Sequence, residues 1–240
     1  MRLQAKNLVV GYGAKTVFGD IDFTANAGEM VALLGVNGIG KSTLLKTLSG
    51  ALLKQSGSLL ISGKELSELN VQQRALQLSV VLTEKLWLDN MLVKDFIALG
   101  RAPHTGSMGT LTLADKQIVE RVIENTRATA LAAKFFNELS DGEKQKVLIA
   151  RALCQDTPVI VLDEPTAFLD FRNRYEVLKL LKRICVEEGK TVVLSTHDIE
   201  NSLEVCRKCW IMTEEKRFIE KEIKDKTDRE EVKRILFSGA

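Results

Sequence analysis

Residues 35–42 have the sequence Gly35-Val36-Asn37-Gly38-Ile39-Gly40-Lys41-Ser42, which is the most informative segment of the chain. A glycine, four residues and then Gly-Lys-Ser is the spacing of a loop that binds phosphate groups. The apolar run at residues 30–34 predicts a buried strand before the loop, and residues 42–53 have a helical pattern after it. A plain glycine-rich turn is the alternative, and the strand–loop–helix context argues against it.

The residue types of this loop suit the phosphates of ATP. Glycine lets the backbone turn tightly and aim several N–H groups at phosphate oxygens, and the positive end of the following helix points at the same oxygens. Lys41 would reach the β- and γ-phosphates, and the Ser42 hydroxyl would ligate Mg²⁺. We expect ATP to bind at Gly35, Asn37, Gly38, Gly40, Lys41, Ser42 and Thr43.

A second apolar run ends in two carboxylates. Residues 159–162 read Val-Ile-Val-Leu, and Asp163 and Glu164 follow them. Acids at the end of a buried strand are costly unless they meet a cation or solvent. Asp163 would hold Mg²⁺ through water, and Glu164 would orient or deprotonate the attacking water. A strand-to-loop turn with exposed acids is the alternative.

His197 follows a third apolar run at residues 192–196. A lone histidine is more often structural than catalytic. In an open parallel sheet, however, the carboxyl ends of the strands share one crevice, where ligands bind. His197 would lie there with Gly35 and Asp163, and it would donate a hydrogen bond to the γ-phosphate.

The segment Leu139-Ser140-Asp141-Gly142-Glu143 precedes a helical pattern. Read locally, Ser140 is an N-cap and Glu143 closes a capping box, which requires no further function. The N-terminus of a helix is nevertheless a site that favours anions. Tyr12, between Gly11 and Gly13, is either a tyrosine in a hairpin or a platform for a purine ring.

The remaining patterns indicate the fold class. Residues 3–34 alternate in places between apolar and polar, as short antiparallel strands do. Helical patterns dominate residues 85–156, at residues 93–99, 114–126 and 143–154. We therefore predict an α/β fold: an ATP-binding core with a mixed, mainly parallel sheet over residues 1–84 and 157–240, and a helical subdomain over residues 85–156.

Composition excludes several classes of protein. The chain has 240 residues and a net charge of 34 − 32 = +2, so it lacks the basic field that would favour nucleic acid. It contains no apolar run of about 18 residues and no standard export signal. The four cysteines are too few for a disulfide scaffold. Cys206 and Cys209 have redox spacing, but the thioredoxin-like context is absent.

In this order, the motifs resemble the ATP-binding subunit of ABC transporters, over essentially the whole chain. Leu139–Glu143 looks like the family signature Leu-Ser-Gly-Gly-Gln. The resemblance implies an ATPase that forms a homodimer around two ATP molecules. Ser140, Gly142 and Glu143 would then contact ATP held by the second copy, and Asp170 would lie on the loop that crosses the dimer interface. Tyr12 would stack on adenine, and His197 would be the switch histidine.

Three positions depart from the family pattern. Asp141 replaces a signature glycine, and Glu143 replaces the signature glutamine. Glu84 stands where the family has a glutamine that ligates Mg²⁺ and links the core to the helical subdomain. A carboxylate also ligates Mg²⁺, so we expect Glu84 to be a metal-site residue.

The segment at residues 99–106, Leu-Gly-Arg-Ala-Pro-His-Thr-Gly, resembles part of the importer ATPases for iron-siderophores, haem and cobalamin. It implies a peripheral protein on the cytoplasmic face of the membrane. The implied partners are two copies of an integral membrane permease and, indirectly, a substrate-binding protein. A helix end followed by a Pro/Gly turn explains the segment equally well. The rival function is a soluble ABC ATPase of iron–sulfur cluster assembly that acts on scaffold proteins.

Overall fold

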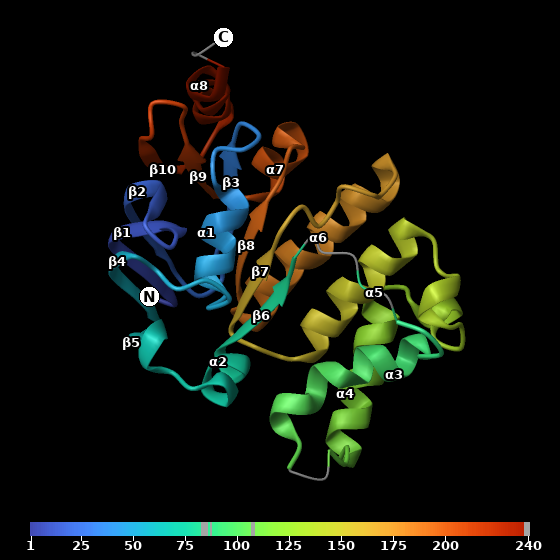
Figure 1. The fold of residues 1–240 in the computed structure, drawn as a ribbon. Helices are drawn as coiled ribbons and strands as arrows, with labels where there is room; N and C mark the ends of the chain where they lie inside the picture. Colours follow the sequence, from blue (N-terminus) through green and yellow to red (C-terminus); the bar gives the residue numbers. More distant parts are fainter. Residues whose placement is uncertain (83–85, 87, 107–108, 238–240) are drawn as a thin grey trace.

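The strands form two sheets. The computed structural model describes residues 1–82, 86, 88–106 and 109–237 (Figure 1). The four-stranded sheet is antiparallel, in the order β2-β1-β4-β5, and the six-stranded sheet has the order β10-β9-β3-β8-β7-β6. The strands are β1 (Leu3–Tyr12), β2 (Lys15–Ala25), β3 (Met30–Gly35), β4 (Ser56–Ile61), β5 (Lys64–Glu65), β6 (Leu78–Val81), β7 (Val159–Leu162), β8 (Thr191–Ser195), β9 (Lys208–Met212) and β10 (Phe218–Glu222).

The six-stranded sheet is parallel except for β10, which pairs antiparallel with β9. It is buried on both faces, and for this reason its inner strands are continuous apolar runs. Successive side chains of β3 enter different cores: Met30, Ala32 and Leu34 join one apolar cluster, and Val31 and Leu33 join the other.

Helices cover both faces of this sheet. Helix α1 lies on the side of the antiparallel sheet, and α6 lies on the opposite side. The helices are α1 (Lys41–Leu48), α2 (Val71–Gln77), α3 (Val93–Ala98), α4 (Leu113–Asn125), α5 (Asp141–Cys154), α6 (Phe171–Glu188), α7 (Ile199–Val205) and α8 (Lys226–Phe237).

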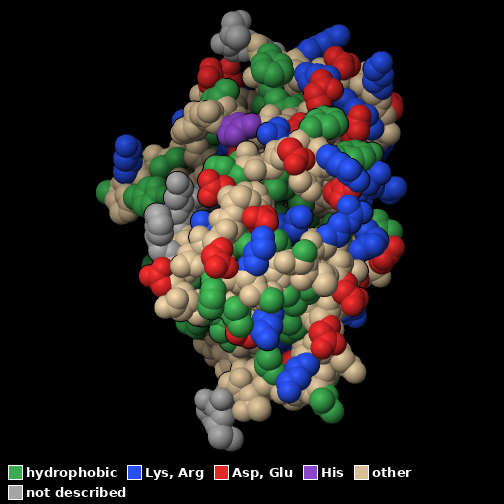
Figure 2. Space-filling view, turned by 90° about the vertical axis from the view of Figure 1, so that its right-hand side faces the viewer, with side chains coloured by type: hydrophobic (Ala, Val, Ile, Leu, Met, Phe, Trp, Pro, Cys, Tyr) green, Lys and Arg blue, Asp and Glu red, His purple; other side chains and the backbone are tan. Residues whose placement is uncertain are grey.

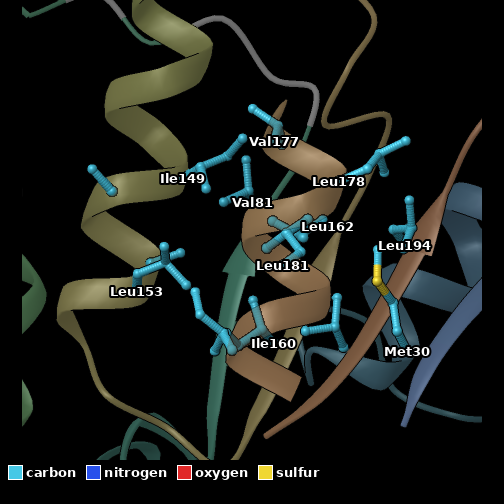
Figure 3. Packing of buried hydrophobic residues seen from close by; sticks show 14 of the residues in the cluster. Met30, Val81, Ile149, Leu153, Ile160, Leu162, Val177, Leu178, Leu181 and Leu194 are labelled. Atoms are coloured by element: carbon cyan, nitrogen blue, oxygen red, sulfur yellow. The ribbon is translucent and has the colours of Figure 1, made fainter. Parts of the chain in front are cut away.

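Helices α3, α4 and α5 come between β6 and β7 in the chain and lie together at one end of the molecule (Figure 1). Their apolar side chains continue the core of the sheet. Figure 3 shows Ile149 and Leu153 of α5 facing Val81 of β6 and Leu162 of β7, with Leu181 of α6 beside them. The predicted α/β fold is confirmed, and the division at residues 85 and 156 stays a prediction.

The surface mixes charges of both signs. On the face drawn in Figure 2, Lys and Arg side chains stand among Asp and Glu side chains, as the small net charge leads one to expect. Within the part of the chain that the structure describes, we find no helix that is both long and apolar enough to span a bilayer.

Candidate active site

Three neighbouring strands end at the same edge of the sheet. In the order β3-β8-β7, Leu33 pairs with Ser195, and Leu194 pairs with Leu162. The loops that begin after these strands therefore start side by side. One is the glycine-rich loop, one carries Asp163 and Glu164, and one carries His197.

The glycine-rich loop has a backbone that other residues rarely adopt. Gly38 has a φ of 76° and Gly40 a φ of 121°. A Cβ atom on Gly40 would lie 2.8 Å from Cγ1 of Val17 on β2, so a side chain there would clash. Gly40 is the N-cap of α1, and no side chain caps this helix. The first N–H groups of α1 are thus available to an anion.

Lys41 lies inside this loop. Its side chain is buried, with 7% of the residue exposed, and Nζ donates to the carbonyl oxygens of Gly35 at 2.6 Å and Val36 at 3.2 Å. Burial lowers the pKa of the Lys41 ammonium, and the charges of Glu164 and Asp163 oppose that shift. The structure thus brings Lys41 and both acids together. Phosphate oxygens bound here would replace the two carbonyl contacts of Lys41.

Asp163 is a buried carboxylate at the carboxyl end of β7. Its N–H donates to the carbonyl of Val81 on β6 at 2.7 Å. Its Oδ1 accepts a hydrogen bond from the Ser195 hydroxyl on β8 at 2.5 Å. Sequence reasoning did not select Ser195. A hydroxyl residue at the end of an apolar strand is the signal that could have found it.

Glu164 has an unusual backbone with a φ of 49°, a left-handed conformation that costs a non-glycine residue on the order of 1–3 kcal/mol. Its Oε1 lies 3.0 Å from Nε2 of His197, and its Oε2 accepts the His197 N–H at 3.3 Å. The side chain of Glu164 is 15% exposed and that of His197 is 54% exposed. Burial raises the pKa of Glu164, although the charges of His197 and Lys41 oppose this. Glu164 thus faces the site with a carboxylate that protonates more easily than an exposed one.

The side chains at this edge suit Mg²⁺. The Ser42 hydroxyl is exposed at the start of α1, and Asp163 supplies a carboxylate. Mg²⁺ in nucleotide sites takes one or two protein oxygens and completes its shell with phosphates and water. Accordingly, the described residues contain no cluster of three or more His, Cys, Asp or Glu side chains placed to bind a metal. Glu84, the further predicted ligand, lies outside the described residues.

The signature segment forms the start of α5. The Ser140 N–H donates to Glu143 Oε2 at 2.9 Å, and the Glu143 N–H donates to Ser140 Oγ at 3.3 Å. These bonds lower the pKa of Glu143, so its carboxylate stays ionised. The predicted capping box is therefore present. Among the described residues, neither a hydrogen bond nor an ion pair joins Ser140 or Glu143 to the glycine-rich loop.

Asp170 is the N-cap of α6, and its carboxylate accepts from the N–H and the side-chain amide of Asn173 at 2.8 and 2.7 Å. The loop before it touches the signature segment, because a Cβ atom on Gly142 would lie 3.1 Å from the Phe168 carbonyl oxygen. The structure thus brings Gly142 and the Asp170 loop together within one chain.

Tyr12 ends β1 at the hairpin with β2 and is half exposed. This hairpin reaches the glycine-rich loop through Val17, as the close approach to Gly40 shows. Tyr12 is therefore placed on an element that borders the loop, with its ring open to a ligand.

The segment at residues 99–106 holds the C-terminal end of α5. The Arg101 guanidinium donates to the Cys154 carbonyl at 3.0 Å and to Asp115 of α4 at 2.9 Å, and Arg101 is 5% exposed. His104 Nε2 lies 2.8 Å from the Gln155 carbonyl oxygen. The Gln155 side chain in turn donates to the carbonyls of Ala75 on α2 and of Leu78, the first residue of β6. These contacts of Arg101, His104 and Gln155 join the end of α5 to the sheet, and we call them the Arg101–Gln155 clamp.

Cys206 and Cys209 are buried and not disulfide-bonded. Burial raises the pKa of both thiols, that of Cys209 to about 12. Since the thiolate is the reactive form, redox chemistry at this pair is disfavoured.

Comparison with known proteins identifies the family. Residues 18–167, more than half of the chain, match the model of the ABC transporter family. An ABC transporter ATP-binding protein of Methanocaldococcus jannaschii is 41% identical over 86% of this chain and 71% of its own length. The iron(3+)-hydroxamate import ATP-binding protein FhuC of Bacillus subtilis is 32% identical over 83% of this chain and 74% of its own length.

A solved structure agrees with these relatives. A chain from a structure described as a metal-chelate type ABC transporter in an inward-facing conformation superposes with a TM-score of 0.82. It is 28% identical, and the match covers 99% of this chain and 89% of that one. Together with the glycine-rich loop and the acids beside it, these matches show that this chain belongs to the ABC transporter family, as one of its ATP-hydrolysing members.

Proposed function

We propose that this chain dimerises around two ATP molecules and powers a membrane importer for a metal chelate. The observation that carries the catalytic part is the contact of Glu164 with His197 beside Lys41 and Asp163 at one edge of the sheet. The relatives named above support the transport part, since one is named for iron(3+)-hydroxamate import and one structure for metal-chelate transport.

The chemistry follows from the roles of these side chains. The N–H groups of the loop and Lys41 hold the phosphates of ATP. Ser42 and, through water, Asp163 would hold Mg²⁺, which would supply positive charge against the phosphate oxygens. Glu164 orients the attacking water or accepts its proton, which a buried carboxylate with a raised pKa does well near neutral pH. His197 donates to the γ-phosphate and stabilises charge as it develops. Tyr12 stacks on the adenine ring.

A second copy completes the site. In Figure 1 helix α5, which begins within the signature segment, lies with α3 and α4 in what we call the helical part. The glycine-rich loop, which precedes α1, lies on the other side of β6 and β7. A head-to-tail dimer would set Ser140, Gly142 and Glu143 of one copy against ATP on the other, with the two Asp170 loops at the interface. ATP then favours the closed dimer and hydrolysis reverses it.

The helical part is the proposed contact with the permease. Leu99 and Leu113 each lie two residues before a member of the buried Arg101–Asp115 pair, and both are exposed apolar side chains. A movement of the permease against this surface would reach the clamp and, through the rigid helix α5, the signature segment at its other end. The chain would then lie peripherally on the cytoplasmic face of the membrane.

Copurification tests the transport function. The tagged full-length chain is isolated from detergent-solubilised membranes of its native host, and the bound proteins are identified by mass spectrometry. We expect an integral membrane permease, and ATP turnover of that complex that rises with a ferric hydroxamate and its binding protein. Recovery of soluble iron–sulfur scaffold proteins in place of a permease would support the rival function in cluster assembly.

A further inference from the structure

Ser195 connects two of the proposed functional residues. It is the last residue of β8, and it is fully buried. Its hydroxyl donates to Asp163 Oδ1 at 2.5 Å, and its oxygen accepts the backbone N–H of Glu164 at 2.9 Å. We propose that Ser195 is a positioning residue for ATP hydrolysis. Its hydroxyl orients the Asp163 carboxylate and also holds the backbone of Glu164 in place. This role rests on the proposed roles of Asp163 and Glu164.

A hydroxyl is suited to this bridge because it donates one hydrogen bond while it accepts another. The donated bond goes to an ionised carboxylate in a buried position, where such bonds are strong and short. It fixes one carboxylate oxygen of Asp163, so that the other oxygen keeps a defined direction. Asp163 would hold Mg²⁺ through water, and its orientation therefore sets where the metal lies.

The accepted bond acts on the backbone of Glu164. This residue has the left-handed φ of 49°, and a left-handed residue persists only where its surroundings hold it. The Ser195 oxygen holds the N–H of this residue. The Glu164 side chain contacts His197, which follows Ser195 by two residues in the sequence. One strand end thus supplies both the group that fixes the turn and the histidine that Glu164 contacts.

Ser79 provides a matched comparison on the same sheet. It lies on β6, which pairs with β7 on the side opposite to β8, and it is also fully buried. Its hydroxyl has no hydrogen-bond partner among the described residues. Removal of this hydroxyl tests what the loss of a buried serine oxygen does in general, without touching Asp163 or Glu164.

The experiment compares Ser195→Thr with Ser195→Val, which are alike in size and differ in the hydroxyl. ATP turnover is measured against free Mg²⁺, and binding of a fluorescent ATP analogue is measured with EDTA and with Mg²⁺. We expect Ser195→Val to lower kcat about 10- to 100-fold relative to Ser195→Thr and to raise the Mg²⁺ concentration for half-maximal turnover about tenfold. In EDTA the two variants should bind the analogue within about twofold, while Mg²⁺ strengthens binding less in Ser195→Val.

Equal kcat and equal Mg²⁺ dependence in the two variants would overturn the role of Ser195. If either variant is too unstable to assay, Ser195→Ala is compared with Ser79→Ala; a loss of kcat in the first alone supports the proposal, and equal values overturn it. The wild-type chain and Glu164→Gln are assayed in parallel. A wild type without Mg²⁺-dependent turnover, or an unimpaired Glu164→Gln, would contradict the proposed function itself and thereby remove the basis for Ser195.

Discussion

Glu164 combines a strained backbone, a buried carboxylate and a contact with His197. If it orients or deprotonates the attacking water, Glu164→Gln should lower kcat about 10²–10⁴-fold, because the amide keeps the shape of the side chain but cannot accept the proton. Binding of ATP in EDTA should stay unchanged. Steady-state turnover and equilibrium nucleotide binding measure the two effects. Glu187→Gln, on the exposed surface of α6, is the control and should leave both unchanged; normal turnover in Glu164→Gln would exclude the role.

The pH dependence of turnover follows from the same carboxyl group. Burial raises the pKa of Glu164 above its ordinary value of 4.5, so the protonated, inactive form accumulates at a higher pH than it would for an exposed glutamate. We expect kcat/KM to fall, as the pH is lowered, through an apparent pKa above 4.5. A rate profile of the wild type measures it, and the residual turnover of Glu164→Gln should lack this acidic limb. A limb at or below 4.5 would contradict the assignment.

At the scale of elements, α5 is held at both ends. Ser140 and Glu143 cap its N-terminus, and Arg101 binds the carbonyl of Cys154 at its C-terminus. Positive side chains there satisfy carbonyls that lack partners within the helix and complement its dipole. The Gly-Arg-Ala-Pro-His segment therefore fixes the end of α5, and Arg101 is buried inside the helical part. This structural role does not depend on the proposed contact with a permease.

We expect the buried Arg101–Asp115 ion pair to contribute much of the stability that this clamp provides. Arg101→Ala leaves Asp115 buried without its cation, and we expect the melting temperature to fall by about 5–10 °C. Arg172, which makes a long, exposed contact with Glu176, is the matched control. Arg172→Ala should change the melting temperature by no more than about 2 °C. Thermal unfolding followed by circular dichroism compares the two variants, and equal shifts would contradict a special role for the clamp.

Local patterns predicted those elements whose signals are local. The strand, glycine-rich loop and helix at residues 30–48 and the cap at Ser140 are examples. The helix after the loop was predicted to reach residue 53, which is wrong: α1 ends at Leu48, and Gly50 follows with a φ of 72°. The sequence does not predict β10, because its pairing with β9 depends on a partner strand and not on its own mixed pattern. Ser195 and the Arg101 clamp depend on contacts between distant segments, which spacing along the chain does not reveal.

At the scale of the whole molecule, the two halves of the proposed site lie on different parts of one chain. The glycine-rich loop belongs to the sheet, and the exposed Ser140 belongs to the helical part. Each chain would contribute its loop to one ATP and its signature segment to the other. In a symmetric dimer both sites are then identical and both are shared. A defect in either half inactivates a homodimer, but defects in different halves should complement each other.

Mixing two inactive variants tests this shared site. Lys41→Ala removes the cation of the loop, and Ser140→Asp keeps an N-cap residue while it places a negative charge beside the phosphates of the partner's ATP. Each homodimer should be inactive. In a heterodimer one site carries both defects and the other carries none, so the purified heterodimer should recover about half of wild-type turnover. Coexpression with two different tags, followed by ATPase assay of the doubly purified dimer, measures the recovery. Ser140→Asp alone should still bind ATP in EDTA, because its own loop is intact. A heterodimer as inactive as its parents would contradict the shared site and indicate that one chain contains a complete site by itself.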